Sequence, residues 1–116
     1  MYPLNTDAID LRVVNATVYN NKITAYDDGI VVKPCSNTGT YCTCAGDVEA
    51  YGNHLEFTTG LSIGSVSPSE TIPCVKNVYF HDNYLWRPLK AIYVKPNPKR
   101  EGDTGKAEIY TITYEN

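Results

Sequence analysis

The chain has 116 residues, of which 42% are hydrophobic, enough for one globular domain and too apolar for a disordered chain. Ten basic and thirteen acidic residues give a formal net charge of −3, which attracts neither nucleic acid nor an anionic membrane surface. No run approaches the ~18 apolar residues that span a bilayer, so neither a nucleic-acid nor a membrane partner is predicted.

The N-terminal residues, MYPLNTDAID, have neither the basic nor the apolar stretch of a secretory signal. Four cysteines and a possible glycosylation acceptor, Asn15-Ala16-Thr17, nevertheless fit an extracellular protein. If the protein is secreted, its signal must lie upstream of Met1, which would make this chain a truncated product or a fragment.

Short β-strands are predicted along the whole chain, because Val, Ile, Thr and Tyr are frequent and Asn, Asp, Gly and Pro interrupt them at short intervals. Three segments align without gaps: NATVYNNKITAYDDGIVVKP, GDVEAYGNHLEFTTGLSIGS and KNVYFHDNYLWRPLKAIYVKP. Their residues Val18, Val48 and Val78 are thirty residues apart. A shorter copy ending in NTDAIDL precedes them, and an incomplete copy, KAEIYTITYEN, follows. The chain is therefore built from internal repeats.

Each copy is too small to bury a hydrophobic face alone, but stacked copies can do so. We expect one all-β domain over residues 1–116, a β-helix with repeats near 15–45, 46–75 and 76–105 and partial copies at each end, about four to five coils in all. Parallel strands of successive coils are then expected to bury two apolar ladders. These ladders are Ile9, Ile30, Leu61 and Ile92, and beside them Leu11, Val32, Ile63 and Val94.

The same alignment suggests how the cysteines pair. Cys44 and Cys74 each lie four residues before an aligned valine, at neighbouring turns, so a bridge between adjacent coils is plausible. Cys35 and Cys42 would then close the insertion SNTGTY. Neither the cysteine spacing nor the two histidines match a zinc site, so no metal and no cofactor is predicted.

A column of polar residues precedes the inward ladder. It contains Asp7, Asp28, Thr59 and Lys90, with Asp27 beside Asp28. Three carboxylates within about two coil spacings repel one another and raise the pKa of at least one, which gives them little structural value. An inverting glycosidase needs one protonated and one ionised carboxyl group roughly 6.5–9.5 Å apart, a gap that Asp7 and Asp27 could supply. The alternative is a solvated turn at 27–28 and a loop cap at Asp7.

Four segments follow one another in coil register: NTD at 5–7, DD at 27–28, GLSIGS at 60–65 and YVK ending at Lys95. Together they resemble glycoside hydrolase family 28, which includes polygalacturonases and rhamnogalacturonases and shows N-T-D, D-D, G-H-G-L-S-I-G-S and R-I-K segments in this order. The resemblance covers nearly the whole chain. It implies a right-handed parallel β-helix of the pectin-lyase-like kind, here incomplete, in a secreted hydrolase of cell-wall pectin.

Carried over by position, the resemblance implies that Asp27 is the general acid and that Asp7 and Asp28 hold and deprotonate the attacking water. Lys95 corresponds to the lysine that contacts a uronate carboxylate, to which an ammonium can donate a charge-assisted hydrogen bond. The implied partner is a pectic or other uronate-containing polysaccharide, hydrolysed with inversion. The full-length protein is expected to be a monomer.

Two positions depart from the family pattern. The family histidine falls on Thr59 and the family arginine on Tyr93, so a proton-network partner and a bidentate carboxylate clamp are both missing. Lys90 and Lys33 are candidate replacement cations, with ordinary surface charge as the alternative for both. Tyr93 is a candidate sugar-stacking ring, one of ten tyrosines in the chain. His54 is a weaker candidate to replace the histidine, because it lies five residues before Thr59.

Three functions therefore stay open. The first is a polygalacturonase-like glycosidase, a function that the full-length protein could have even if this fragment is inactive. The second is a carbohydrate-binding or structural β-helix that has lost turnover with its histidine and arginine. The third, a polysaccharide lyase on the same architecture, is less favoured because such enzymes usually neutralise the uronate with calcium or arginine. With few coils and open edges, the isolated chain is expected to be marginally stable or prone to aggregate.

Overall fold

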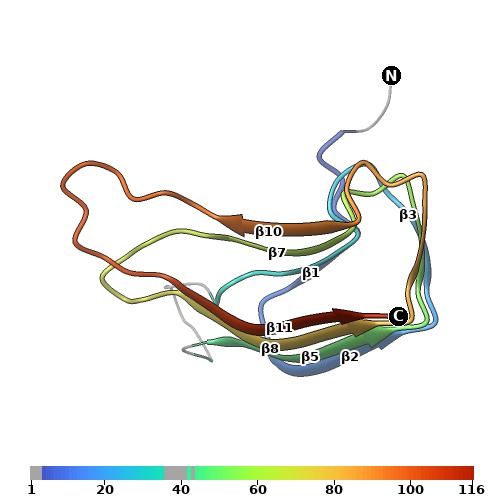
Figure 1. Ribbon diagram of the computed structural model, residues 1–116, viewed down its shortest axis with the longest axis horizontal. Coiled ribbons are helices and arrows are strands. Elements are labelled where there is room, and N and C mark those ends of the chain that lie inside the picture. The colour runs from blue at the N-terminus through green and yellow to red at the C-terminus, as the bar shows by residue number, and fades with distance from the viewer. Residues whose placement is uncertain (1–3, 36–41, 43) are drawn as a thin grey trace.

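The computed structural model describes residues 4–35, 42 and 44–116, and its regular elements are all β-strands wound into a solenoid (Figure 1). The first coil contains β1 (Ile9–Leu11), β2 (Val14–Tyr19) and β3 (Lys22–Thr24). The second contains β4 (Ile30–Val32), β5 (Ala45–Tyr51) and β6 (His54–Glu56). The third contains β7 (Leu61–Val66), β8 (Cys74–His81) and β9 (Tyr84–Trp86), and a fourth contributes β10 (Ile92–Pro96) and β11 (Glu108–Glu115).

The coils number three with a partial fourth, fewer than the four to five expected, because NTDAIDL begins the first coil and does not end a preceding one. The strands form three parallel sheets, ordered β1-β4-β7-β10, β2-β5-β8-β11 and β3-β6-β9. The parallel solenoid predicted from the repeat is thereby confirmed.

The first sheet, β1-β4-β7-β10, has the predicted ladders. Ile30 pairs with Ile9 on one side and Leu61 on the other, and Leu61 pairs with Ile92. The second ladder, Leu11, Val32, Ile63 and Val94, follows in the same register. The members from the two middle coils are buried, whereas Ile92 of the last coil is 55% exposed. Apolar burial between stacked coils, each side chain contributing about 1.5–3 kcal/mol when fully buried, is therefore what stabilises the middle of this sheet.

The second sheet corrects one part of the predicted alignment. Val48 does pair with Val78, but its partner in the first coil is Ala16, while Val18 pairs with Ala50. The slip is two residues, so the same side chains still face inward, since strand side chains alternate with a period of two. Its cause is the differing length of chain between the first and second sheets, which is residues 12–13 in the first coil and 33–44 in the second. The coils therefore share no single thirty-residue period.

A buried asparagine ladder supports the turn between the second and third sheets. Asn53 is 1% exposed. Its Oδ1 accepts hydrogen bonds from the Asn21 backbone N–H and side-chain amide, both at 3.0 Å. Its Nδ2 donates to the carbonyl oxygen of Val18 and to Oδ1 of Asn83. Because every polar atom of the amide has a partner, the turn stacks coil on coil without leaving an unsatisfied group in the core.

Two disulfides match the pairing suggested by the alignment. Cys44 of the second coil is bonded to Cys74 of the third, with their Cα atoms 4.8 Å apart. Cys35 is bonded to Cys42, with a Cα–Cα distance of 6.0 Å, and the insertion between them, 36–41, lies outside the described residues. In the part of the chain that the structure describes, no helix is long and apolar enough to cross a membrane.

Candidate active site

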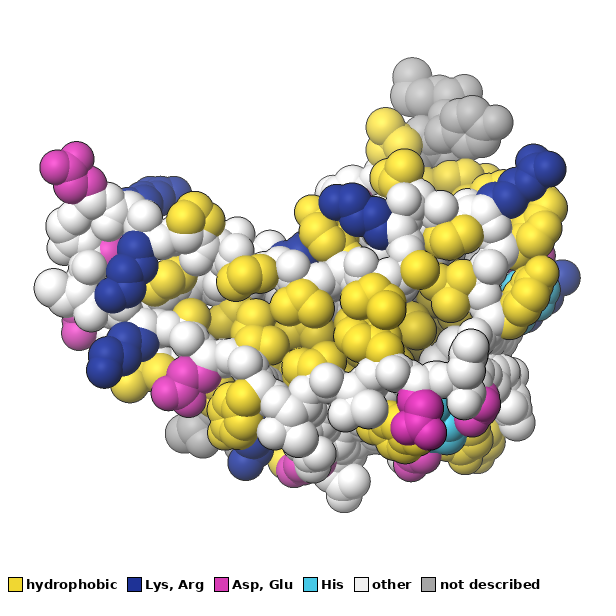
Figure 2. All heavy atoms as spheres, in the orientation of Figure 1, with side chains coloured by type: hydrophobic (Ala, Val, Ile, Leu, Met, Phe, Trp, Pro, Cys, Tyr) yellow, Lys and Arg dark blue, Asp and Glu magenta, His cyan; other side chains and the backbone are white. Residues whose placement is uncertain are grey.

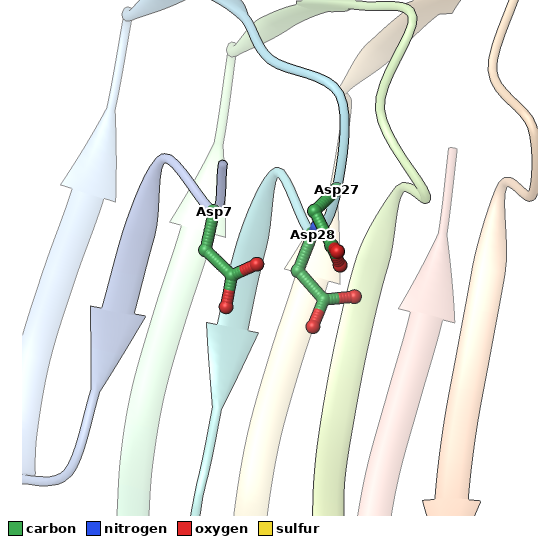
Figure 3. A group of neighbouring side chains, drawn as sticks. All are labelled: Asp7, Asp27 and Asp28. Atoms are coloured by element: carbon green, nitrogen blue, oxygen red, sulfur yellow. The ribbon is translucent and has the colours of Figure 1, made fainter. Parts of the chain in front are cut away.

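Three aspartates lie together beside the strands of the first sheet (Figure 3). Asp7 lies two residues before β1, and Asp27 and Asp28 lie just before β4. The segments are already stacked before the strands begin, since Ala8 N donates to Asp28 O at 3.0 Å. One carboxylate oxygen from each residue lies within 4.8 Å of the others. The three carboxylates therefore converge outside one sheet, as the alignment predicted.

The spacing of these groups differs from the expected one. An oxygen of Asp7 and an oxygen of Asp27 lie no more than 4.8 Å apart, closer than the roughly 6.5–9.5 Å expected for two carboxyl groups that flank a water and a glycosidic bond. Coil stacking sets this distance, because parallel strands of neighbouring coils lie only about 4.8 Å apart. The separation therefore gives no support of its own to inversion.

Asp28 is the most buried member, at 2% exposed. Its Oδ1 accepts hydrogen bonds of 2.7 Å from the hydroxyls of Thr59 and Ser62, and its Oδ2 forms an ion pair with Lys95 Nζ. A buried carboxylate is tolerated when it is paired and hydrogen-bonded in this way. Asp28 is thus a fixed charge whose orientation is set from two neighbouring coils.

The segment GLSIGS supplies this support through its backbone as well as its side chains. Gly60 has a φ of 84°, and a Cβ there would lie 2.2 Å from the carbonyl oxygen of Ala91 in the next coil. Only glycine fits such an approach. Thr59, which stands where the family has histidine, donates to Asp28. Ser62 was not singled out from the sequence, although it belongs to the family-like segment.

Asp27 is half-buried, and its Oδ1 accepts a 2.8 Å hydrogen bond from the backbone N–H of Asp28. The peptide therefore orients the carboxyl group that the sequence assigns as the acid. Asp27 shares an open polar depression of about 320 Å³ with Asp7 and Asp28, and the other lining residues are Asn5, Arg12, Lys33, Ser65 and Lys95. Figure 2 shows that the surface above β10 is hollowed and that basic side chains lie at its margin.

Lys33 connects Asp7 to Asp10 of β1. Its Nζ lies 2.9 Å from Asp7 Oδ2 and 2.8 Å from Asp10 Oδ2. Partial burial acts to raise the pKa of Asp7, but the hydrogen bond and positive charge of Lys33 outweigh it, so this pKa is lowered. Burial likewise opposes ionisation of Lys33, and its two carboxylate partners raise its pKa above the ordinary value. Asp7 is therefore ionised at neutral pH, as a water-activating base must be.

The predicted substrate-contacting lysines meet at one aromatic ring. Lys90 Nζ lies 3.7 Å from the centre of the Tyr93 ring, and Lys95 Nζ lies 5.2 Å from the same centre. Tyr93 thus contacts two ammonium groups, whereas the sequence suggested a ring for sugar stacking. Lys90 belongs to the predicted column, but its ammonium contacts this ring rather than the aspartates.

His54 does not replace the missing histidine, because it belongs to β6 in the third sheet and does not line the depression. Its Nε2 lies 3.2 Å from Glu56 Oε1 yet makes no hydrogen bond of acceptable geometry. A short distance alone does not make a hydrogen bond, so the Nε2 atom is without a hydrogen-bond partner among the described residues. His54 packs its ring against Tyr84 and is a structural residue of that face.

A cation could also bind three such carboxylates, and Asp7, Asp27 and Asp28 are the one group of this kind among residues 4–35, 42 and 44–116. Two of the three, however, already accept hydrogen bonds from the ammonium groups of Lys33 and Lys95. The protein thus supplies its own positive charge at this place, and the arrangement is better suited to acid–base chemistry than to holding a metal.

Comparison with known proteins gives one match. The family model described as glycosyl hydrolases family 28 matches residues 3–116, almost the whole chain. Neither the curated proteins nor the solved structures include a match to it.

Proposed function

The chain belongs to family 28 of the glycosyl hydrolases, and we propose that it hydrolyses glycosidic bonds in a galacturonate-containing polysaccharide. Family membership supports the general class, a glycoside hydrolase. The observation that carries the finer proposal is the convergence of Asp7, Asp27 and Asp28 at one open polar depression. Such a group provides both a proton donor and a proton acceptor within reach of one bound sugar.

Asp27 is the proposed general acid. It lines the depression and is oriented by the Asp28 peptide, so it can protonate the leaving glycosidic oxygen. Asp7, kept ionised by Lys33, accepts a proton from the attacking water, and Asp28 holds that water with it. Inversion at the anomeric carbon, with water attacking from the face opposite the leaving oxygen, is proposed from the family resemblance and not from the spacing of the carboxylates.

The proposed substrate class follows from the cations around the depression. Arg12, Lys33 and Lys95 line it together with the aspartates. A polyanionic chain needs fixed positive charge to offset the carboxylates that carry out the chemistry, because like charges in a narrow cleft repel. The two disulfides, which are typical of oxidising compartments, support action outside the cell, on pectic or related wall polysaccharide.

The proposal is tested by the release of reducing ends from de-esterified polygalacturonan. Removing a general acid costs about 10²–10⁴-fold in rate, so Asp27→Asn should lose at least about 100-fold. Asp47→Asn is the matched control, because Asp47 lies on β5 in the second sheet. No release by the parent chain, or equal release by Asp27→Asn, would contradict a hydrolase with this acid.

A second candidate is a binding module that no longer turns over its ligand. It is favoured by Thr59 and Tyr93, since neither can shuttle protons or clamp a carboxylate as the family histidine and arginine do. Calorimetric binding of oligogalacturonides without cleavage would select it. A lyase would instead reveal itself by the ultraviolet absorbance of an unsaturated sugar product.

A further inference from the structure

Tyr93 lies under two positively charged groups whose surroundings differ. Both ammonium nitrogens lie within the roughly 6 Å over which a cation is attracted to an aromatic face. Lys90 is nearer, at 3.7 Å from the ring centre, and Lys95 is farther, at 5.2 Å. A neutral ring can attract two ammonium groups at once, which a third cation at this position could not do.

Lys95 is already committed to the catalytic group. Its Nζ forms an ion pair with the buried Asp28, and its side chain is only 17% exposed. Leaving Asp28 for a substrate would strand a buried carboxylate without its cation, which is strongly unfavourable. Lys95 is therefore better placed to fix Asp28 than to bind a substrate carboxylate by itself.

Lys90 has the opposite character. Its residue is exposed, and among the described residues no carboxylate lies within ion-pair distance of its ammonium. The cation–π contact holds a long, flexible side chain in place without neutralising its charge. An ammonium that is ordered and still unneutralised is prepared to receive an anion.

The backbone places Lys90 in line with the aspartates. Leu89 N donates to Thr58 O at 2.8 Å, so Lys90 lies next to Thr59, and Thr59 in turn donates to Asp28. Two coil spacings amount to about 10 Å along the solenoid axis. A substrate carboxylate bound by the Lys90 ammonium would therefore belong to a sugar next to the one whose bond is cleaved.

We propose that Lys90 recognises a uronate carboxylate of the polysaccharide, and that Tyr93 is a positioning residue that directs Lys90 to the substrate and Lys95 to Asp28. This rests on the proposed function, since it names a contact within the same site. In this chain Lys90, Lys95 and the Tyr93 ring together take the place of the single arginine of the family pattern. An arginine at 93 would repel the nearby Lys90 ammonium, which the Tyr93 ring instead attracts, so Tyr93 and Lys90 act together.

The test is calorimetric binding of trigalacturonate and of its fully methyl-esterified form, in an Asp27→Asn background that prevents cleavage. Lys90→Gln should weaken binding of the charged ligand about tenfold and leave the esterified ligand unchanged, because only the charged ligand gains the ion pair. Lys90→Arg should retain binding. Tyr93→Leu should weaken it, whereas Tyr93→Phe, which keeps the ring, should not. Lys22→Gln on β3 is the matched control.

The outcomes separate this inference from the function on which it rests. If Asp27-dependent cleavage occurs but Lys90→Gln binds both ligands as its background does, the hydrolase stands and the role of Lys90 is refuted. Equal loss of both ligands would also refute it, because a structural defect does not discriminate by charge. If the background protein binds neither ligand, both proposals fail. If Tyr93→Leu does not fold, the comparison of Lys90→Gln with Lys90→Arg still tests the role of Lys90, and Tyr93→Phe still tests the role of the ring.

Discussion

Replacing Lys95 by methionine should destabilise the protein, because it removes the cation from a carboxylate that stays buried. Asp28 is 2% exposed, and its Oδ2 is the atom that Lys95 contacts. Breaking a buried ion pair by removing one partner costs about 3–5 kcal/mol. The hydroxyls of Thr59 and Ser62 still hydrogen-bond to Oδ1, and Lys95 is itself 17% exposed, so the lower end applies. We expect the free energy of unfolding to fall by about 3 kcal/mol.

The assay is urea unfolding at neutral pH with the disulfides intact, using the parent, Lys95→Met, Asp28→Asn and the double variant. Asn keeps an acceptor for the two hydroxyls and removes the charge, so the double variant should recover about half or more of the loss. A double variant as unstable as Lys95→Met would refute the reasoning, because the unpaired charge would then not be the cause. So would a loss below about 1 kcal/mol, the value typical of an exposed pair.

Two further effects concern stability. The pKa of His81 is raised by hydrogen bonds to Asp82 and Glu49, so the stability from this cluster is complete below the ordinary pKa of about 6.5 and is lost as pH rises through the higher folded value. Urea unfolding of the parent and His81→Gln at pH 5.5 and 8.5 should show the larger difference at pH 5.5; the reverse order would contradict the assigned charge. Replacing Cys44 and Cys74 together by serine opens a bridge with a sequence separation of 30 and should lower the unfolding free energy by about 3–4 kcal/mol. Thermal scans check this, and an unchanged midpoint would mean that the bridge does not restrict the unfolded chain.

The ladders and the aspartate group were predictable for one shared reason. In the first sheet, the apolar pairs recur with a single residue between them, and Asp7 and Asp28 each lie two residues before the first apolar member. Once parallel stacking is assumed, that fixed offset brings the carboxylates together. The prediction needed no side-chain coordinates, because backbone register alone places the residues.

The register of the second sheet was harder to predict from the sequence. The alignment gave Val18 the wrong partner, since the turn between the sheets differs in length from coil to coil and turns carry no apolar pattern. The asparagine ladder, in contrast, could have been found. An asparagine ends the dipeptides at 20–21, 52–53 and 82–83, each just after an aromatic or histidine residue. Recurrent asparagine at one turn indicates stacked amides.

The partners of the lysines could not be read from the sequence. The family resemblance implied that Lys95 contacts a uronate carboxylate, and Lys90 was a candidate replacement cation because it stands in the same column as the aspartates. Long side chains choose among partners several ångströms away, and the choice depends on which groups neighbouring coils bring within reach. The buried carboxylate of Asp28 attracts Lys95, and the ring of Tyr93 attracts Lys90.

The central claim is that Asp7, Asp27 and Asp28 form one acid–base group on this solenoid. Proton NMR of the first product released from trigalacturonate tests it most directly, because the anomeric signal reports both cleavage and its stereochemistry. The account predicts a product of inverted configuration from the parent chain and no product from Asp27→Asn. A product of retained configuration, or the same product from both proteins, would contradict it.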